Sequence, residues 1–155
     1  MIKRFISLLA LTFCLIPASY ASDVYTDCSN LVTEYAYYRD RFDALGFSNL
    51  FTEDATLSVG GQTWAGRSEI RARIEGLDDS AKIRHLMSTI RIAQVDARHA
   101  TGVSYATIYT GSAGSNSVEG FAVIGEYHDQ FVLTEAGWRI SSRELRSVFS
   151  YEDAQ

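Results

Sequence analysis

The chain has 155 residues, 46% of them hydrophobic and 21% charged, and its formal net charge at pH 7 is −5. This length is enough for one domain with a real hydrophobic core. The acidic balance argues against nucleic acid and against anionic membrane surfaces as partners, because both repel a negatively charged protein.

Residues 1–21 have the features of a targeting signal that is removed from the mature protein. A positively charged start is followed by an apolar run over 5–16 and by the helix-breaking Pro17. The run is shorter than the roughly 20 apolar residues that span a membrane. We therefore predict cleavage after Ala21, a secreted or periplasmic protein, no membrane span, and a single domain over 22–155. Two basic residues leave with the signal, so the net charge becomes −7.

Neither a metal nor a cofactor is predicted. Cys14 leaves with the signal, so Cys28 has no partner within the chain. We expect a small, half-buried thiol there, and a disulfide to a second molecule is the alternative. The histidines His85, His99 and His128 lie on separate predicted elements, without the close spacing of metal ligands.

The first half of the domain is predicted to be largely helical. Apolar residues at spacings of three and four predict a long helix over 25–45, ended by Gly46. A short second helix that runs into a turn is predicted within 47–55. The segment 55–66 reads as a hairpin with a Gly-Gly turn, and 67–77 as a short amphipathic helix.

The second half is predicted to consist of strands. Four long strands are expected at about 83–95, 99–110, 117–133 and 138–150, joined by short connections and one loop of small residues. Helices followed by a run of antiparallel strands indicate the α+β class, with a curved sheet around a long helix.

Five segments carry a resemblance to a known family. They are "YAYYRDRFDALGFSNLFTEDATL" (35–57), "GRSEI" (66–70), "RHLMSTIRI" (84–92), "SYATIY" (104–109) and "GEYHDQFVLTEAGWRISSR" (125–143). In this order they resemble the SnoaL-like branch of the NTF2-like superfamily. The resemblance implies an NTF2-like cone, in which a curved, mixed and mostly antiparallel sheet wraps around a long N-terminal helix with two short helices. It does not fix the chemistry, since the superfamily includes both enzymes and binding modules.

Within this superfamily the chain resembles scytalone dehydratase and the bile-acid dehydratases. Those enzymes place a tyrosine and an aspartate on the first helix and a histidine on the strand after the third helix. The matching residues are Tyr35, Asp40 and His85. The group often has an asparagine four residues after the histidine, where this chain has Thr89. A later-strand histidine of the fungal enzyme has no counterpart, since His128 is expected to face outward.

The residues themselves also suggest an acid/base pair. Strand alternation places His85 on one face with Met87, Thr89 and Arg91. A carboxylate that accepts from one imidazole nitrogen leaves the other nitrogen to take or give a proton. The alternatives stay open: His85 bonded to a backbone carbonyl, and Asp40 exposed and paired with a neighbouring arginine.

Asp129 is predicted to point inward, because it alternates with apolar residues along its strand. A buried carboxylate needs a partner, and Arg139 or Arg143 on the next strand can provide it. His128 then lies on the outer face. The residues expected to line the pocket are Tyr38, Met87, Tyr105, Tyr127, Asp129 and Arg143.

Two functions from different classes follow from these observations. The first is cofactor-free acid/base chemistry of lyase or isomerase type on a small hydrophobic carbonyl compound. In it, His85 is the base, Asp40 its orienter or the acid, and Tyr35 a hydrogen-bond donor. The second is a non-catalytic domain that binds a small ligand or another protein. A homodimer through the exposed sheet face is compatible with either function.

Overall fold

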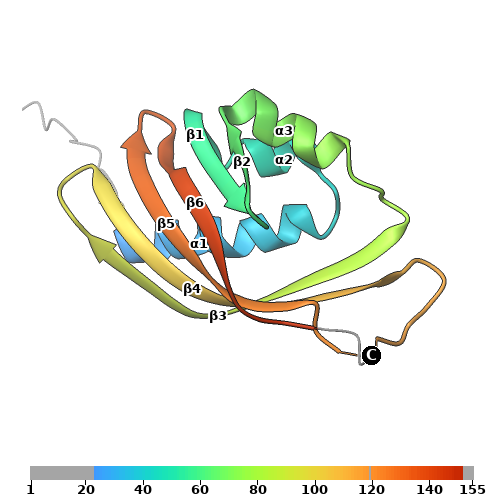
Figure 1. The fold of residues 1–155 in the computed structure, drawn as a ribbon. Helices are drawn as coiled ribbons and strands as arrows, with labels where there is room; N and C mark the ends of the chain where they lie inside the picture. Colours follow the sequence, from blue (N-terminus) through green and yellow to red (C-terminus); the bar gives the residue numbers. More distant parts are fainter. Residues whose placement is uncertain (1–22, 119, 152–155) are drawn as a thin grey trace, which may run out of the picture.

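The structure is a computed structural model that describes residues 23–118 and 120–151 (Figure 1). The predicted signal over 1–21 lies outside these residues. The elements, in chain order, are α1 (Val24–Arg39), α2 (Ala44–Ser48), β1 (Phe51–Val59), β2 (Gln62–Ala65), α3 (Arg67–Glu75), β3 (Ala81–Gln94), β4 (His99–Ser112), β5 (Val123–Thr134) and β6 (Gly137–Ser150). The predicted α+β class is confirmed.

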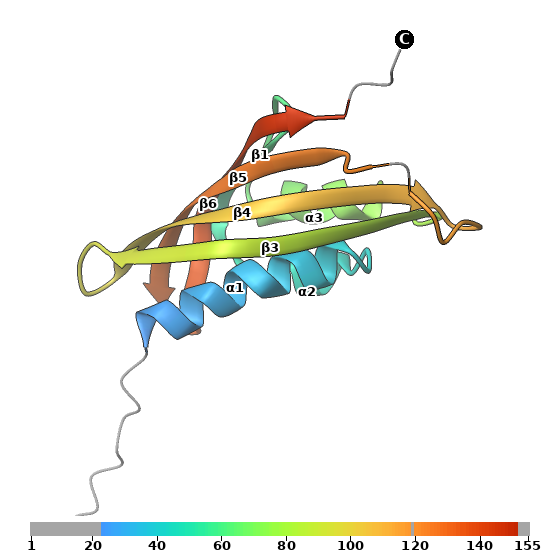
Figure 2. The same cartoon turned by 90° about the horizontal axis from the view of Figure 1, so that it is seen from below.

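The six strands form one curved sheet in the order β2-β1-β6-β5-β4-β3. β1 and β6 run parallel, and the other neighbouring pairs are antiparallel. Helix α1 lies along the concave side of this sheet, and α2 and α3 lie beside β1 and β2 (Figure 1). Figure 2 shows the length of α1 following the long edge strand β3. The predicted cone around the N-terminal helix is confirmed.

Helix α1 begins at a local cap and buries one face. The side chain of Asp23 accepts a hydrogen bond from the backbone N–H of Tyr25 at 3.2 Å, which satisfies one of the free donors of the first turn. Side chains three and four positions apart are buried against the sheet: Cys28, Leu31, Val32, Tyr35, Ala36 and Arg39. None of the helices in the described residues is long and apolar enough to cross a membrane.

The first helix is shorter than predicted. It ends at Arg39, with Asp40 as its C-cap, and the chain turns through Phe42, which has a φ of 57°. The side chain of Asp43 then accepts from the N–H of Gly46 at 2.8 Å and starts α2. Gly46 therefore lies within the second helix and does not end the first. The prediction failed because a local Asp cap interrupts an otherwise helical pattern.

Two further boundaries differ from the predictions. The segment 47–55 is mostly strand, because β1 starts at Phe51 and buries Ala55 and Leu57. β5 starts at Val123, so the chain before it is a connection and not a strand. The hairpin of β1 and β2, helix α3 and the other long strands lie where they were expected, within a few residues.

Strand β3 contains a bulge that reverses its inward face. The pairing with β4 gains one extra residue on β3 between Ser88 and Arg91. Before the bulge His85 and Met87 face the core, and after it Ile90 and Ile92 do, while Arg91 is exposed. The prediction that Thr89 and Arg91 share the face of His85 is therefore wrong. The bulge lets both parts of the strand bury apolar side chains.

Cys28 is fully buried, deeper than the half-buried position that was predicted. Burial raises the pKa of its thiol to about 12, and the nearby Asp27 and Asp129 add to the rise. A protonated thiol without exposure is a poor nucleophile, which argues against a disulfide to a second molecule.

Thr89 provides a test of the bulge. Its φ of 48° lies in the left-handed region, where a β-branched side chain is strained and asparagine is tolerated. We expect Thr89→Asn to raise the free energy of unfolding by about 1 kcal/mol in urea denaturation. Thr101→Asn, in ordinary strand backbone of β4, is the matched control and should give no gain. Equal effects of the two changes would contradict strain at Thr89.

Candidate active site

His85 and Asp40 form a buried pair. Asp40 Oδ1 accepts from the Nδ1 of His85 at 2.6 Å, and Asp40 Oδ2 accepts from the backbone N–H of His85 at 3.1 Å. The two side chains are only 4% and 7% exposed. Both oxygens of the Asp40 carboxylate are thus bonded to His85. These two bonds fix the imidazole ring and leave its Nε2 as the nitrogen for proton exchange.

The pair joins two elements that are far apart in the sequence. Asp40 caps the C-terminal end of α1, and His85 faces inward from β3, which runs along that helix. The two alternatives are not observed: Nδ1 of His85 bonds a side chain and not a backbone carbonyl. Arg41 bonds the carbonyl of Tyr37 and lies over its ring, so it does not pair with Asp40.

Tyr35 lies beside this pair. The edge-to-face rings of Tyr35 and His85 have centroids 6.2 Å apart, and Tyr35 is 1% exposed. The hydroxyl of Tyr127 donates to that of Tyr35 at 3.5 Å. Burial raises the pKa of Tyr127 well above its usual value, with a further contribution from Tyr35. The structure therefore brings Tyr35, Asp40 and His85 together, with a second, protonated phenol next to them.

An ion pair lies below the two tyrosines. Arg143 donates from Nε and Nη2 to the two carboxylate oxygens of Asp129, both at 2.7 Å, and both side chains are fully buried. The guanidinium carbon lies 4.1 Å from the ring centre of Tyr35 and 4.6 Å from that of Tyr127. Burial alone would lower the pKa of Arg143, but Asp129 outweighs it, and the pKa is raised.

Asp129 points inward as predicted, and its partner is Arg143, one of the two candidates. Arg139 instead donates to the carbonyl of Trp138. Tyr127 belongs to the same buried layer. Met87 and Tyr38 are partly buried and pack against the core.

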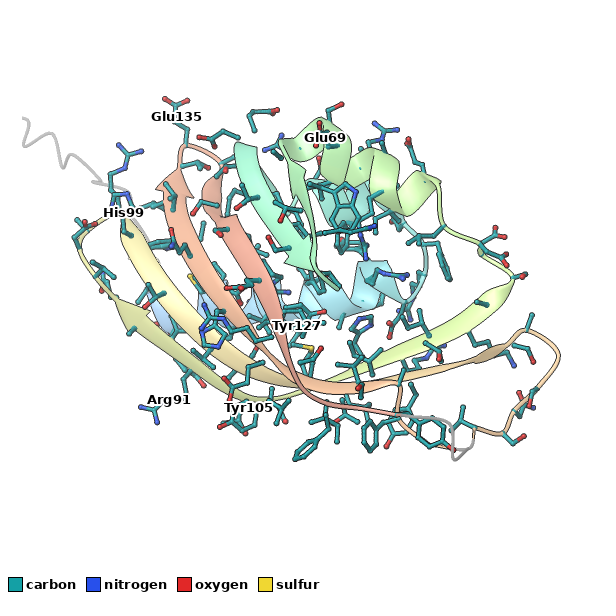
Figure 3. The ribbon with its side chains drawn as sticks, in the orientation of Figure 1. Glu69, Arg91, His99, Tyr105, Tyr127 and Glu135 are labelled. Carbon is teal, nitrogen blue, oxygen red and sulfur yellow. The ribbon has the colours of Figure 1, made fainter. Side chains whose placement is uncertain are left out.

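Tyr105 is misplaced in the predicted pocket. It is 44% exposed and lies on the outer side of the sheet, because Ser104 and Ala106 take the inward positions of β4. Figure 3 shows Tyr105 on the side away from the helix. His99 is exposed, and its Nδ1 bonds Asp96 at 2.9 Å.

Two arginines with buried nitrogen atoms were not predicted from the sequence. Arg39 is 9% exposed, and Arg73 on α3 has its Nη1 atom buried. The signal for Arg39 was its position four residues after Tyr35, in phase with the buried side of α1.

The comparisons with known proteins agree with this fold. The family model described as a SnoaL-like domain matches residues 21–144. The chain belongs to the SnoaL-like family. No curated protein matches it.

Solved structures share the fold of this SnoaL-like chain. An NTF2-like protein with a cystatin-like fold from Novosphingobium aromaticivorans has 25% identity and a TM-score of 0.71, over 81% of this chain and 82% of the other. A candidate scytalone dehydratase from the same organism has 21% identity and a TM-score of 0.71, over 84% and 87%. A hexachlorocyclohexane dehydrochlorinase has 12% identity and a TM-score of 0.71, over 84% and 90%.

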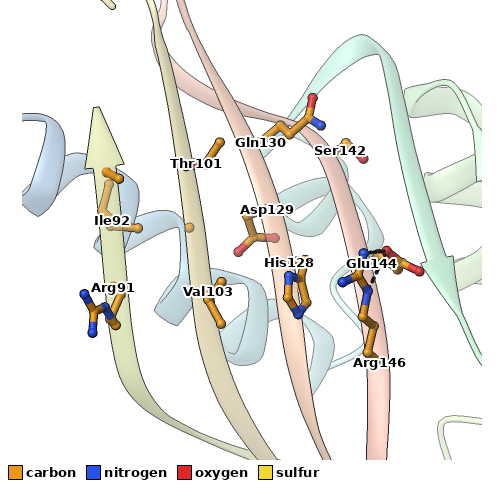
Figure 4. Close-up of a pocket in the computed structure, with 12 residues that line it drawn as sticks. Arg91, Ile92, Thr101, Val103, His128, Asp129, Gln130, Ser142, Glu144 and Arg146 are labelled. Carbon is orange, nitrogen blue, oxygen red and sulfur yellow. Dashed lines mark hydrogen bonds and ion pairs between the residues drawn. The ribbon is translucent and has the colours of Figure 1, made fainter. Parts of the chain in front are cut away.

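The outer face of the SnoaL-like domain carries a separate hollow of about 590 Å³ (Figure 4). Charged side chains from β3, β5 and β6 border it, among them Arg91, His128 and Glu144. His128 bonds Glu126 at 3.1 Å, so it lies on the outer face as predicted. In the described part of the chain, no group of three or more His, Cys, Asp or Glu side chains is arranged to hold a metal ion.

The contribution of the buried Asp129–Arg143 ion pair to stability can be tested by substitution. Asp129→Asn should lower the free energy of unfolding by about 3–5 kcal/mol, because it leaves the guanidinium of Arg143 buried without its counter-charge. Glu144→Gln, which removes the exposed partner of Arg146, is the control and should leave stability nearly unchanged. Urea denaturation of both variants measures the difference, and equal losses would contradict a buried charge pair.

Proposed function

We propose that this SnoaL-like domain catalyses cofactor-free acid/base chemistry, of lyase or isomerase type, on a small hydrophobic carbonyl compound. The observation that carries the proposal is the buried hydrogen bond of 2.6 Å between His85 and Asp40, with Tyr35 beside it. This combination supplies a positioned base, an orienting carboxylate and a hydroxyl donor within one buried site.

In the proposed reaction, His85 removes a proton next to the carbonyl of the substrate through Nε2. Asp40 holds the proton on Nδ1 and stabilises the imidazolium that forms. Tyr35, whose phenol lies next to Tyr127, donates a hydrogen bond to the oxygen on which negative charge develops. The imidazolium then returns the proton, either to a leaving hydroxyl in an elimination or to another carbon in an isomerisation.

The names of two structural neighbours support the elimination. A dehydratase and a dehydrochlorinase both remove a small molecule from their substrates, one as water and the other as hydrogen chloride. Because His85 is only 4% exposed, a substrate reaches Nε2 when neighbouring side chains move aside. Exclusion of water strengthens each electrostatic contact inside the site.

Turnover of a panel of β-hydroxy ketones tests the proposal, with the absorbance of the conjugated enone as the readout. His85→Ala should lower kcat/KM by at least about 100-fold, the usual contribution of a general base. His99→Ala is a matched control, since His99 forms the same Nδ1–carboxylate bond with Asp96 at an exposed site. Unchanged turnover in His85→Ala, or no turnover of any compound by the natural protein, would contradict this function.

The second candidate is a non-catalytic binding domain, which the outer hollow favours because His85 and Asp40 do not line it. We propose a second copy of the chain as its occupant. On the same sheet face, a row of paired residues runs through Leu86, Thr107, Ile124 and Phe149, with Leu86 57% and Phe149 61% exposed. Both signs of charge border the hollow, so a two-fold contact can set arginine against glutamate.

Leu86→Asp tests this dimer. The change should convert a dimer to a monomer in sedimentation velocity, because it buries a charge within the contact. Leu45→Asp on α2 is the matched control, with a leucine exposed to 56%. A natural protein that sediments as a monomer would contradict the dimer.

The secreted or periplasmic location stays a prediction from residues 1–21, and the N-terminal sequence of the exported protein checks it.

A further inference from the structure

Two arginines, Arg39 and Arg73, each place a nitrogen in the protein interior without a hydrogen-bond acceptor among the described residues. Arg39 is the last residue of α1, and its side chain follows that of Tyr35 by one helical turn on the buried face. Arg73 comes from α3, with its guanidinium carbon 4.5 Å from the ring centre of Trp64. The Nη1 atom of each is buried and has no hydrogen-bond partner within residues 23–118 and 120–151.

The charges of the two guanidinium groups act on each other and on the tyrosines of the site. Burial lowers the pKa of Arg39, and the positive charge of Arg73 lowers it further. Arg39 also interacts with Tyr35, Tyr127 and Asp40, and Arg73 interacts with Tyr127. Both cations therefore adjoin the buried layer that contains the Tyr35 ring.

The acidic groups nearby are already bonded. Asp40 accepts from His85 through both oxygens, and Asp129 accepts twice from Arg143. The other arginines of α3 have partners: Arg67 pairs with Glu53, and Arg71 with Glu75. Asp40 offsets part of the charge of Arg39 without accepting a hydrogen bond from it. Leaving a buried N–H without an acceptor is costly, so the two Nη1 atoms indicate an acceptor that the described residues do not supply.

We propose that Arg39 and Arg73 bind the carboxylate of a small hydrophobic acid, whose apolar part lies against Tyr35 and within reach of His85. The proposal rests on the proposed function and narrows its substrate class to carboxylic acids. The planar forks of two guanidinium groups match the two oxygens of a carboxylate. Arg73 is itself half-buried, so its side chain extends from the surface of α3 towards the proposed anion site.

Calorimetric titration at pH 7 with 1-naphthoate and with uncharged 2-naphthol tests the proposal. The natural protein should bind 1-naphthoate more tightly than 2-naphthol. Arg73→Gln should weaken 1-naphthoate binding at least about tenfold, since it removes a charge-assisted hydrogen bond, and leave 2-naphthol unaffected. Arg71→Gln, on the exposed side of the same helix, is the matched control and should bind 1-naphthoate like the natural protein.

Arg39→Gln is the second variant, and thermal unfolding shows whether each variant folds. Equal 1-naphthoate binding by the natural protein and by folded Arg73→Gln would overturn the proposal, as would no binding by the natural protein. Inorganic phosphate alone is a further probe. If phosphate raises the unfolding temperature as much as 1-naphthoate does, and only when Arg73 is present, the site takes a free anion and the carboxylate assignment is wrong.

The same titration separates this inference from the catalytic proposal. His85→Ala should still bind 1-naphthoate more tightly than 2-naphthol, because His85 does not contact the carboxylate. Loss of turnover with retained binding supports both proposals. If the protein turns over neutral compounds as fast as carboxylic acids, only the anion-site proposal is overturned. If it binds 1-naphthoate but turns over no compound, carboxylic or neutral, only the catalytic proposal is overturned.

Discussion

The ion pair of Arg143 and Asp129 is the interaction on which the interior depends. A guanidinium that is fully buried is stable only with a bonded carboxylate, and here both bonds are 2.7 Å long. From this pair a series of contacts leads to the pair of His85 and Asp40. Arg143 lies against Tyr35, Tyr35 meets the edge of His85, and His85 bonds Asp40 at the end of α1. The sheet and the helix are thus joined by polar groups inside an apolar core.

The interior carries more positive charge than negative, although the chain as a whole is acidic. Asp40 and Asp129 are both bonded, while Arg39 and Arg73 have buried nitrogens without partners among the described residues. An interior of this kind repels cations and favours a ligand that brings its own negative charge. The acidic excess must then lie largely on the surface, where it is hydrated and inexpensive.

The fold and the inward direction of Asp129 were predictable because their signals are periodic. Strand alternation placed Asp129 inward, whereas Tyr35, Asp40 and His85 were assigned together through the resemblance to the dehydratases. The failures occurred where a local feature interrupts a period. The Asp43 cap ends the helical pattern early, and the bulge near Thr89 moves the inward face from odd to even positions. Tyr105 was assigned to the pocket because its phenol can donate a hydrogen bond. The alternation along β4 places it on the outer face.

The sequence by itself determined which side chains face inward only where the 3.6-residue and two-residue periods of helix and strand run without interruption. It also restricted the partner of Asp129 to two arginines on the next strand. Only the tertiary structure decided that Asp40 meets His85 and that Arg39 adjoins Arg73. These contacts join elements that are separated by tens of residues, and their distances depend on the curvature of the sheet around α1. No local period in a sequence records that curvature.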